Sequence, residues 1–429
     1  MNKLEYINRV PVSKNNICIQ RDEKKCNNCG ACKGICKSRI GVYDNYDMKK
    51  AKEPICVYCG QCSLICPNKS IHEVEDYKKV KKAILKGRNV IFQVAPASRF
   101  LVGDEFGYPI GKNVIGKIIG TLRQLGVKYV FDTTYGADLT IVEEANELIN
   151  RLKNNEKLPL FTSCCPAWVK YVEEFYPKYK KNLSTCKSPI LMLGSVIKNY
   201  FAPSNEIDKP LVVALVPCTA KKYEVTKTDD VDYAITVREF VKWVREENIN
   251  FRRVESSKFD YFTGTSAGII FGTSGGVTEA MIRYVYHKLT GRNTPKKLLN
   301  FEELRGLNDV KEASVKIKDR ELSIAIINGT GDVPKIIEKI EKEEIHYDVV
   351  EVMACDGGCI AGGGGPKNNK ITNINKTKRS LSMYKIDRNS RLKNSYENKK
   401  IKKLYKDLLI EPNSEMAHKL LHIEVDKDE

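Results

Sequence analysis

The stretch Cys355-Asp356-Gly357-Gly358-Cys359 places two thiols four residues apart and is followed by the glycine run 362–365. Cysteine thiolates are the usual protein ligands of iron-sulfur clusters, and two of them at this spacing can bind one face of a cluster. Glycines lack a Cβ and let backbone come close to a bulky inorganic group. The segment therefore indicates a buried metal cluster.

A second group of cysteines near the start of the chain repeats one spacing twice. Both runs read CxxCxxCxxxC, and Pro67 follows the second. This is the spacing of bacterial ferredoxins with two cubane clusters, in which the last cysteine of each run binds the other cluster. By that rule, one cubane is bound by Cys26, Cys29, Cys32 and Cys66. The other is bound by Cys56, Cys59, Cys62 and Cys36. Two structural zinc sites are the alternative, although zinc favours separated CxxC pairs.

Two further cysteine motifs precede 355–359: residues 162–168 read TSCCPAW and residues 216–222 read VPCTAKK. Together the three motifs resemble the three signatures of the iron-iron hydrogenases. The resemblance continues through 131–147, 271–280 and 395–421, so it covers most of the chain. It implies an H-cluster, which is a four-iron cubane joined through a shared cysteine sulfur to a two-iron unit with carbonyl, cyanide and bridging dithiolate ligands.

The resemblance implies a role for each cysteine of these motifs. Cys165, Cys218, Cys355 and Cys359 would bind the cubane, and Cys359 would also bridge to the two-iron unit. Four thiolates are what one cubane ordinarily requires. Cys164 is then the spare thiol, and the family resemblance makes it the group that passes protons to and from the cluster.

The resemblance also implies which residues surround the two-iron unit. Lys221 lies three residues after Cys218, so a turn can direct its ammonium group, with three N–H donors, toward a cyanide nitrogen. The loop after the strand-like run 90–94 resembles the family loop that offers backbone donors to the other cyanide. The remaining residues of this surround are Ala95, Pro96, Ala97, Ser188, Pro189, Phe271 and Met353.

Glu144 and Glu147 stand three residues apart in a predicted helix and therefore share one face. Such a pair is ordinarily a solvated helix face. Here the two glutamates match the family's proton route, which would run from Cys164 through a water to Glu144, Ser184 and Glu147. Arg151, one turn further along the same face, would mark the outer end of the route.

The elements that must position these residues fall into three zones. Residues 1–78 are cysteine-rich, residues 79–368 alternate short apolar runs with amphipathic stretches, and residues 369–429 are polar and lysine-rich. We expect buried strands at 90–95, 129–132, 211–217 and 323–328, and helices at 116–125, 139–153 and 237–246. This alternation predicts an α/β fold with ligands beyond the strand ends.

The resemblance completes this domain assignment. It implies an α/β catalytic domain of two lobes around a buried H-cluster at 79–368, preceded by a small α+β two-cluster ferredoxin-like domain at 1–78. The last zone, 369–429, resembles a segment that is a separate, wrapping small subunit in some relatives. A simple covering role and a partner-binding surface are both open for it.

Composition limits the classes of function. The 15 cysteines in 429 residues are too sparse for a disulfide scaffold, and their CxxC spacing indicates metal binding in a reducing compartment. No apolar run of about 18 residues and no signal peptide is found, so we expect a cytoplasmic protein without a membrane span. The net charge of +18 accompanies no nucleic-acid module, and it is typical either of a solvated lysine-rich surface or of steering toward an acidic ferredoxin or flavodoxin.

The resemblance implies an enzyme of anaerobic hydrogen metabolism that reversibly reduces protons to H₂ with a ferredoxin-type carrier. Maturation proteins would insert its two-iron unit. A hydrogen sensor and a non-catalytic iron-sulfur assembly protein are the alternatives; Cys164 and Lys221 argue against the second. Val216 and Ile190 replace a methionine and a glutamine that many active members have, which puts the activity level in doubt. Cys18 and Cys186 have no assigned role and are expected to be small buried thiols.

Overall fold

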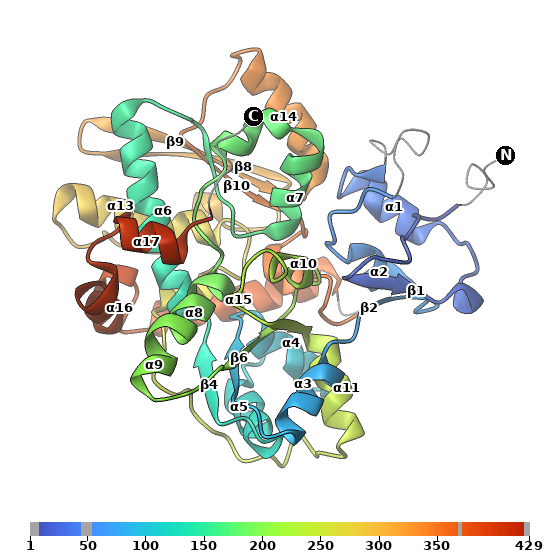
Figure 1. The fold of residues 1–429 in the computed structure, drawn as a ribbon. Helices are drawn as coiled ribbons and strands as arrows, with labels where there is room; N and C mark the ends of the chain where they lie inside the picture. The colour runs from blue at the N-terminus through green and yellow to red at the C-terminus, as the bar shows by residue number, and fades with distance from the viewer. Residues whose placement is uncertain (1–7, 44–53, 368–370, 424–429) are drawn as a thin grey trace.

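The computed structural model describes residues 8–43, 54–367 and 371–423 (Figure 1). Its first sheet is parallel throughout, with the strand order β4-β3-β6-β7. The strands are β3 Val90–Val94, β4 Tyr129–Asp132, β6 Leu211–Val216 and β7 Tyr233–Thr236. Every residue of β3 and β6 is buried, which explains why β6 is entirely apolar and β3 is apolar except for the hydrogen-bonded Gln93.

The second sheet has the order β5-β10-β9-β8. Its strands are β5 Leu160–Phe161, β8 Val310–Ile317, β9 Arg320–Asn328 and β10 Val349–Met353. Strands β5, β10 and β9 are parallel, whereas β8 is antiparallel to β9. The two sheets lie in separate lobes, the second above the first in Figure 1. The α/β architecture and the strands expected from the apolar runs are therefore present, with no strand end shifted by more than three residues.

Seventeen α-helices are found in the described residues. In chain order they are α1 Ala31–Ser38, α2 Gln61–Ile65, α3 Tyr77–Leu85, α4 Ser98–Glu105, α5 Ile115–Gln124, α6 Thr134–Asn154, α7 Pro166–Phe175, α8 Pro189–Val196, α9 Ala202–Ser204, α10 Lys221–Glu224, α11 Val237–Glu246, α12 Ser266–Ile270, α13 Gly276–Thr290, α14 Val333–Glu341, α15 Asn373–Asn389, α16 Lys399–Leu404 and α17 Glu415–Leu421. Helix α6 begins five residues before the predicted start, because its first turns are buried on all sides and show no helical periodicity.

The N-terminal unit is a small two-stranded sheet with helices α1 and α2, and it lies at one side of the two lobes (Figure 1). Strand β1 Ile19–Arg21 pairs antiparallel with β2 Ile71–Glu73. The predicted boundary at residue 78 cuts helix α3, which packs on β3 and α11. The N-terminal unit therefore ends before Tyr77.

The segment from α15 to α17 packs against both lobes. In α15, the guanidinium of Arg379 is fully buried, pairs with Asp104 of α4 at 2.8 Å and donates to the Ile360 carbonyl at 3.0 Å. Helix α16 contacts α6, and helix α17 contacts α8. No helix in the described part of the chain is both long and apolar enough to cross a bilayer.

Candidate metal centres

The cysteines of the three central motifs follow the carboxyl ends of parallel strands from both sheets. Cys164 and Cys165 come after β5, Cys218 after β6, and Cys355 after β10. In open α/β sheets, ligands bind beyond these ends. Here the two sheets direct their ends toward one shared cavity.

This central cavity has a volume of about 80 Å³. Its wall is almost entirely apolar apart from the thiols and one ammonium group. It brings together all five cysteines of the three motifs and most of the predicted surround. The predicted residues that line it are Cys164, Cys165, Cys218, Cys355, Cys359, Lys221, Ala95, Pro96, Ala97, Pro189, Phe271 and Met353. Val216 and Ile190, the two departures from the family pattern, also line it.

The glycines around Cys359 allow close packing of protein loops. Gly358 has a φ of +82°, and a Cβ there would lie 2.7 Å from the backbone nitrogen of Ser274. A Cβ on Gly362 would lie 2.4 Å from the carbonyl oxygen of Pro217. The sequence predicted that these glycines let backbone approach a cluster; what the structure shows is that they let the Cys359 loop approach the neighbouring loops of the protein.

The chemistry of the donor set fits an iron-sulfur centre. None of the described cysteines forms a disulfide. Burial raises the pKa of Cys218 and of Cys359 to about 12, and the pKa of Cys165 and Cys355 is raised for the same reason. Gathering several thiolates in an apolar cavity is costly unless a metal cation compensates their charge.

Lys221 is held as an ammonium group at the cavity wall. Its Nζ donates to both carboxylate oxygens of Glu224, at 2.9 and 2.8 Å, and to the Cys164 carbonyl at 3.1 Å. Burial alone would lower the pKa of Lys221, but the attraction of Glu224 outweighs it and the pKa is raised. Ser188 does not line the cavity, contrary to the prediction, because its hydroxyl turns away and donates to Glu224 at 2.9 Å.

The predicted proton route is contiguous along its outer half. The Ser184 hydroxyl donates to Glu147 at 2.8 Å, and Arg151 donates to the other oxygen of Glu147 at 2.5 Å. Arg151 also donates to three backbone carbonyls and is only 8% exposed. It therefore anchors Glu147 from inside the protein and is not itself a surface terminus.

Glu144 occupies the inner half of the route and is fully buried. Neither of its carboxylate oxygens has a hydrogen-bond partner among the described residues, although Ser184 and the Ser163 N–H lie near enough to lower its pKa slightly. Burial, followed by repulsion from Glu147, raises the pKa of Glu144 to about 8. Burial and the nearby Glu144 also keep the pKa of the Cys164 thiol well above its usual range. Both groups therefore hold a proton near neutral pH.

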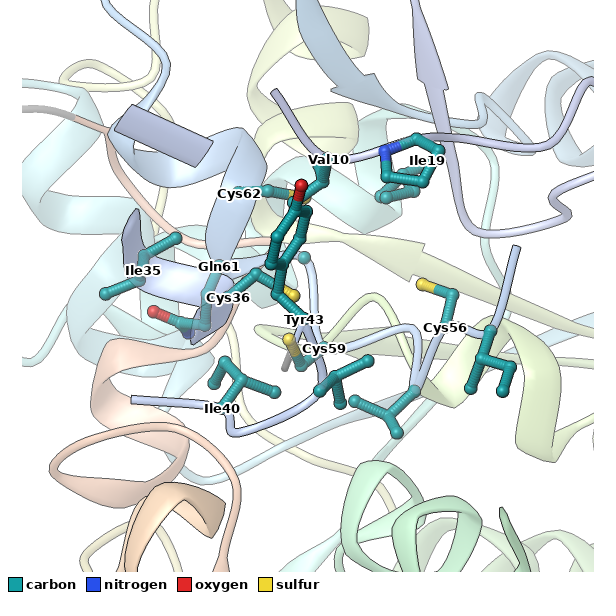
Figure 2. Close-up of a pocket in the computed structure, with 15 residues that line it drawn as sticks. Val10, Ile19, Ile35, Cys36, Ile40, Tyr43, Cys56, Cys59, Gln61 and Cys62 are labelled. Atoms are coloured by element: carbon teal, nitrogen blue, oxygen red, sulfur yellow. The ribbon is translucent and has the colours of Figure 1, made fainter. Parts of the chain in front are cut away.

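The eight N-terminal cysteines line two separate small cavities, four on each. One is lined by Cys26, Cys29, Cys32 and Cys66. The other is lined by Cys36, Cys56, Cys59 and Cys62, and Figure 2 shows these four among apolar side chains such as Val10, Ile19 and Ile40. Each cavity takes three cysteines from one run and one from the other, which is the exchange predicted from the spacing.

A glutamine connects the second of these cavities to the central one. Gln61 lies on the wall of the N-terminal cavity (Figure 2), and its Nε2 donates to Cys355 Sγ at 3.0 Å and to the Ala361 carbonyl at 2.9 Å. The neighbouring Thr219 hydroxyl donates to the Tyr58 carbonyl at 2.6 Å. The thiols of this N-terminal cavity and those of the central cavity are therefore separated by little more than the Gln61 side chain.

Comparison with known proteins identifies the family. Residues 88–363 match the family model of the iron only hydrogenase large subunit, C-terminal domain. The chain belongs to the iron-only hydrogenase family. Residues 373–424 of this iron-only hydrogenase family member match a second model, the iron hydrogenase small subunit, here continuous with the large-subunit domain.

Individual relatives agree with this assignment. The chain is 39% identical to the NADP-reducing hydrogenase subunit HndD of Solidesulfovibrio fructosivorans, over 95% of this chain and 72% of that protein. The structure of a variant of the apo [FeFe]-hydrogenase HydA1 of Chlamydomonas reinhardtii superposes with a TM-score of 0.72 at 32% identity, covering 82% of this chain and 98% of that one. A more distant relative, at 26% identity over 87% of this chain and 84% of its own length, is the cytosolic Fe-S cluster assembly factor narfl of Xenopus tropicalis.

Three residues of the site had not been predicted. Gln61 lies between Cys59 and Cys62 in the second cysteine run, where the spacing pattern places no requirement on the residues between the cysteines, so the sequence contains no signal for it. Glu224 follows Lys221 by three residues on α10, a spacing that could have signalled the ion pair. Glu143 precedes Glu144 on α6 and faces away from the route, toward Tyr405 and His422, which directly follow α16 and α17.

Proposed function

We propose that this chain is an iron-iron hydrogenase enzyme that interconverts protons and H₂. The observation that carries the proposal is the central cavity, where four thiols suited to one cubane meet a fifth thiol, Cys164, that a cubane does not need. Cys165, Cys218, Cys355 and Cys359 would hold the H-cluster, which supplies the redox chemistry of hydrogen when bound.

The chain's own residues would hold the cofactor and move protons. The Lys221 ammonium, oriented by Glu224, is available as a donor to an anionic ligand of the two-iron unit. Cys164 would exchange a proton with Glu144, which then passes it by way of Ser184 to Glu147. A carboxyl group with a pKa near the working pH both accepts and releases a proton readily, and Glu144 meets this condition.

Electrons would reach the cavity through the N-terminal unit. Its two four-cysteine cavities suit two [4Fe-4S] clusters, and the Gln61 contact gives the nearer one a short path to Cys355. The basic surface expected from the net charge of +18 suits an acidic ferredoxin or a flavodoxin as the external carrier, in the cytoplasm. Insertion of the two-iron unit would require separate maturation proteins.

Infrared spectroscopy of the protein matured with its two-iron unit tests the proposal. We expect bands from metal-bound carbonyl and cyanide, together with H₂ evolution when reduced viologen or reduced ferredoxin is supplied. The relationship to an Fe-S assembly factor supports a second candidate, an assembly protein with cubanes alone. That protein would show iron and sulfide but neither the infrared bands nor gas, whereas a hydrogen sensor would show the bands with very slow turnover.

A further inference from the structure

Outside the cavities described above, three side chains of different chemistry converge beside the proton route. Cys186 Sγ lies 3.7 Å from Glu147 Oε2 and 3.9 Å from His422 Nδ1. All three atoms lie within 4.8 Å of one another. Cys186 is 1% exposed and His422 5% exposed, so a thiol and an imidazole meet a carboxylate in a nearly dry setting. From this geometry we propose that Glu147, Cys186 and His422 form a zinc site whose occupation interrupts the proton route.

The backbone fixes the approach of the two distant segments. Cys186 and His422 face one another in an antiparallel bridge. On either side, the Lys187 N–H donates to the Leu421 carbonyl and the Ile423 N–H donates to the Thr185 carbonyl, both at 2.8 Å. The thiol and the imidazole are therefore held by paired backbone, and their proximity does not depend on a chance side-chain rotamer.

A buried carboxylate orients the imidazole for metal binding. His422 Nε2 lies 3.0 Å from Glu143 Oε2, and Glu143 is fully buried and also accepts from the Asn413 N–H at 2.8 Å and from the Tyr405 hydroxyl. A carboxylate can only accept, so Nε2 carries the hydrogen; in the neutral tautomer the Nδ1 lone pair faces the Thr185 hydroxyl at 2.8 Å, with Cys186 Sγ at 3.9 Å. This carboxylate–histidine arrangement is the usual outer support of zinc-binding histidines.

The donor set favours zinc over other cations. Zinc binds thiolate, imidazole and carboxylate with tetrahedral geometry, whereas magnesium and calcium require several oxygen ligands. Tetrahedral ligands at zinc distances are separated by about 3.5 Å, so the two distances from Cys186 Sγ, 3.7 and 3.9 Å, need only a slight contraction, while Glu147 and His422, within 4.8 Å of each other, would close together around the ion. The Thr185 hydroxyl, 2.8 Å from His422 Nδ1, or a water would provide the fourth ligand. Binding would release the thiol proton of Cys186.

Zinc at this position would act on the route that is proposed above, and this part of the inference rests on that proposed function. Glu147 Oε2, the atom nearest Cys186, is the atom that accepts from Ser184 at 2.8 Å. Zinc would take this oxygen and leave the other to Arg151. A proton could then no longer pass from Ser184 to Glu147. The Glu147 side chain is 12% exposed, which gives the ion a short path from solvent.

Zinc content is the direct test, and it does not depend on catalysis. Iron-loaded protein is dialysed anaerobically against micromolar ZnCl₂, and zinc and iron are counted per chain. We expect the parent protein to hold one zinc more than Cys186→Ala or His422→Asn, with affinity lowered at least about 100-fold in both variants. His346→Asn, which removes a mostly exposed imidazole, is the matched control and should keep the zinc. Equal zinc in the parent and both variants would overturn the site.

Two further measurements guard against misfolded variants and against failure of the proposed enzyme. X-ray absorption at the zinc edge of the parent protein should show one sulfur near 2.3 Å with nitrogen and oxygen ligands, and two or more sulfurs would place the ion at the cluster cysteines instead. Viologen-driven H₂ evolution should fall as zinc is added to the parent protein and not in Cys186→Ala. Undiminished evolution at full occupancy would overturn the regulatory role. A protein with no turnover at all would count against the hydrogenase proposal, while the zinc count would still decide the site.

Discussion

Titration of Glu144 makes the free energy of unfolding depend on pH, and we expect Glu144→Gln to remove this dependence. Its pKa is raised from the ordinary 4.5 to about 8 because its buried carboxylate lacks partners. Below pH 4.5 both the folded and the unfolded chain hold this proton. Between pH 4.5 and 8 the unfolded chain releases it while the folded chain keeps it, so stability falls as pH rises, by up to about 1.4 kcal/mol per pH unit.

Glu144→Gln abolishes this titration. Between pH 5 and pH 8, we expect the parent protein to lose about 3.5 kcal/mol of stability relative to the variant. For one cooperative unit of this length that is a relative shift in Tm of roughly 4 °C. The glutamine amide also lacks partners and lowers the Tm at every pH, so the informative quantity is the change of the Tm difference with pH.

Thermal scans at one heating rate, from pH 5 to pH 8, measure this difference. Glu156→Gln, an exposed glutamate just beyond helix α6, is the control and should follow the parent at every pH. If the Tm of the parent and that of Glu144→Gln change with pH in parallel, the raised pKa of Glu144 is wrong. In that case Glu144 would titrate as an ordinary carboxyl group and would hold no proton for Cys164 at neutral pH.

Three other substitutions test the site and the fold. Cys164→Ser should leave the carbonyl and cyanide infrared bands in place while lowering H₂ turnover at least about 100-fold, and undiminished turnover would remove Cys164 from the route. Gln61→Leu deletes the 3.0 Å hydrogen bond to Cys355 Sγ, which would favour the reduced, more negatively charged state of a cubane bound in the central cavity. The reduction potential of that cubane should therefore fall by roughly 30–60 mV in an EPR redox titration. An unchanged potential would contradict this role of Gln61. Arg379→Ala removes the guanidinium that pairs with the buried Asp104 and should cost about 3–5 kcal/mol in denaturant unfolding. Lys378→Ala, at an exposed position, should cost less than about 0.5 kcal/mol, and equal effects would contradict the ion-pair argument.

Cysteine spacing and apolar runs allowed much of this structure to be predicted. The exchange of Cys36 and Cys66 between two cavities follows from spacing alone, because only that arrangement matches the ferredoxin rule. The strands at 90–95 and 211–217 were evident because central strands of a parallel sheet are buried on both faces. The role of the 162–168 motif depended on family resemblance, since its strand β5 has only two residues and gives no periodic signal.

What could not be predicted depends on contacts between distant segments. Cys186 was expected to be a small buried thiol and is indeed buried, yet its neighbour His422 lies 236 residues away in sequence. Ser188 was assigned to the cavity from its place in a motif, but its rotamer and the position of Glu224 decided otherwise. The local sequence pattern predicts which face of a helix or strand is apolar. It does not predict which polar side chains of two different elements come into contact.

The packing of α15 over the Cys359 loop has a consequence for biogenesis. Arg379 of this helix donates to the carbonyl of Ile360, and Met383 packs against Gly272 on the cavity wall. The ribosome makes α15 after both sheets and all of the motif cysteines. The motif cysteines can therefore come together in a nascent chain while this side of the cavity is still uncovered, and docking of α15 would then close that side.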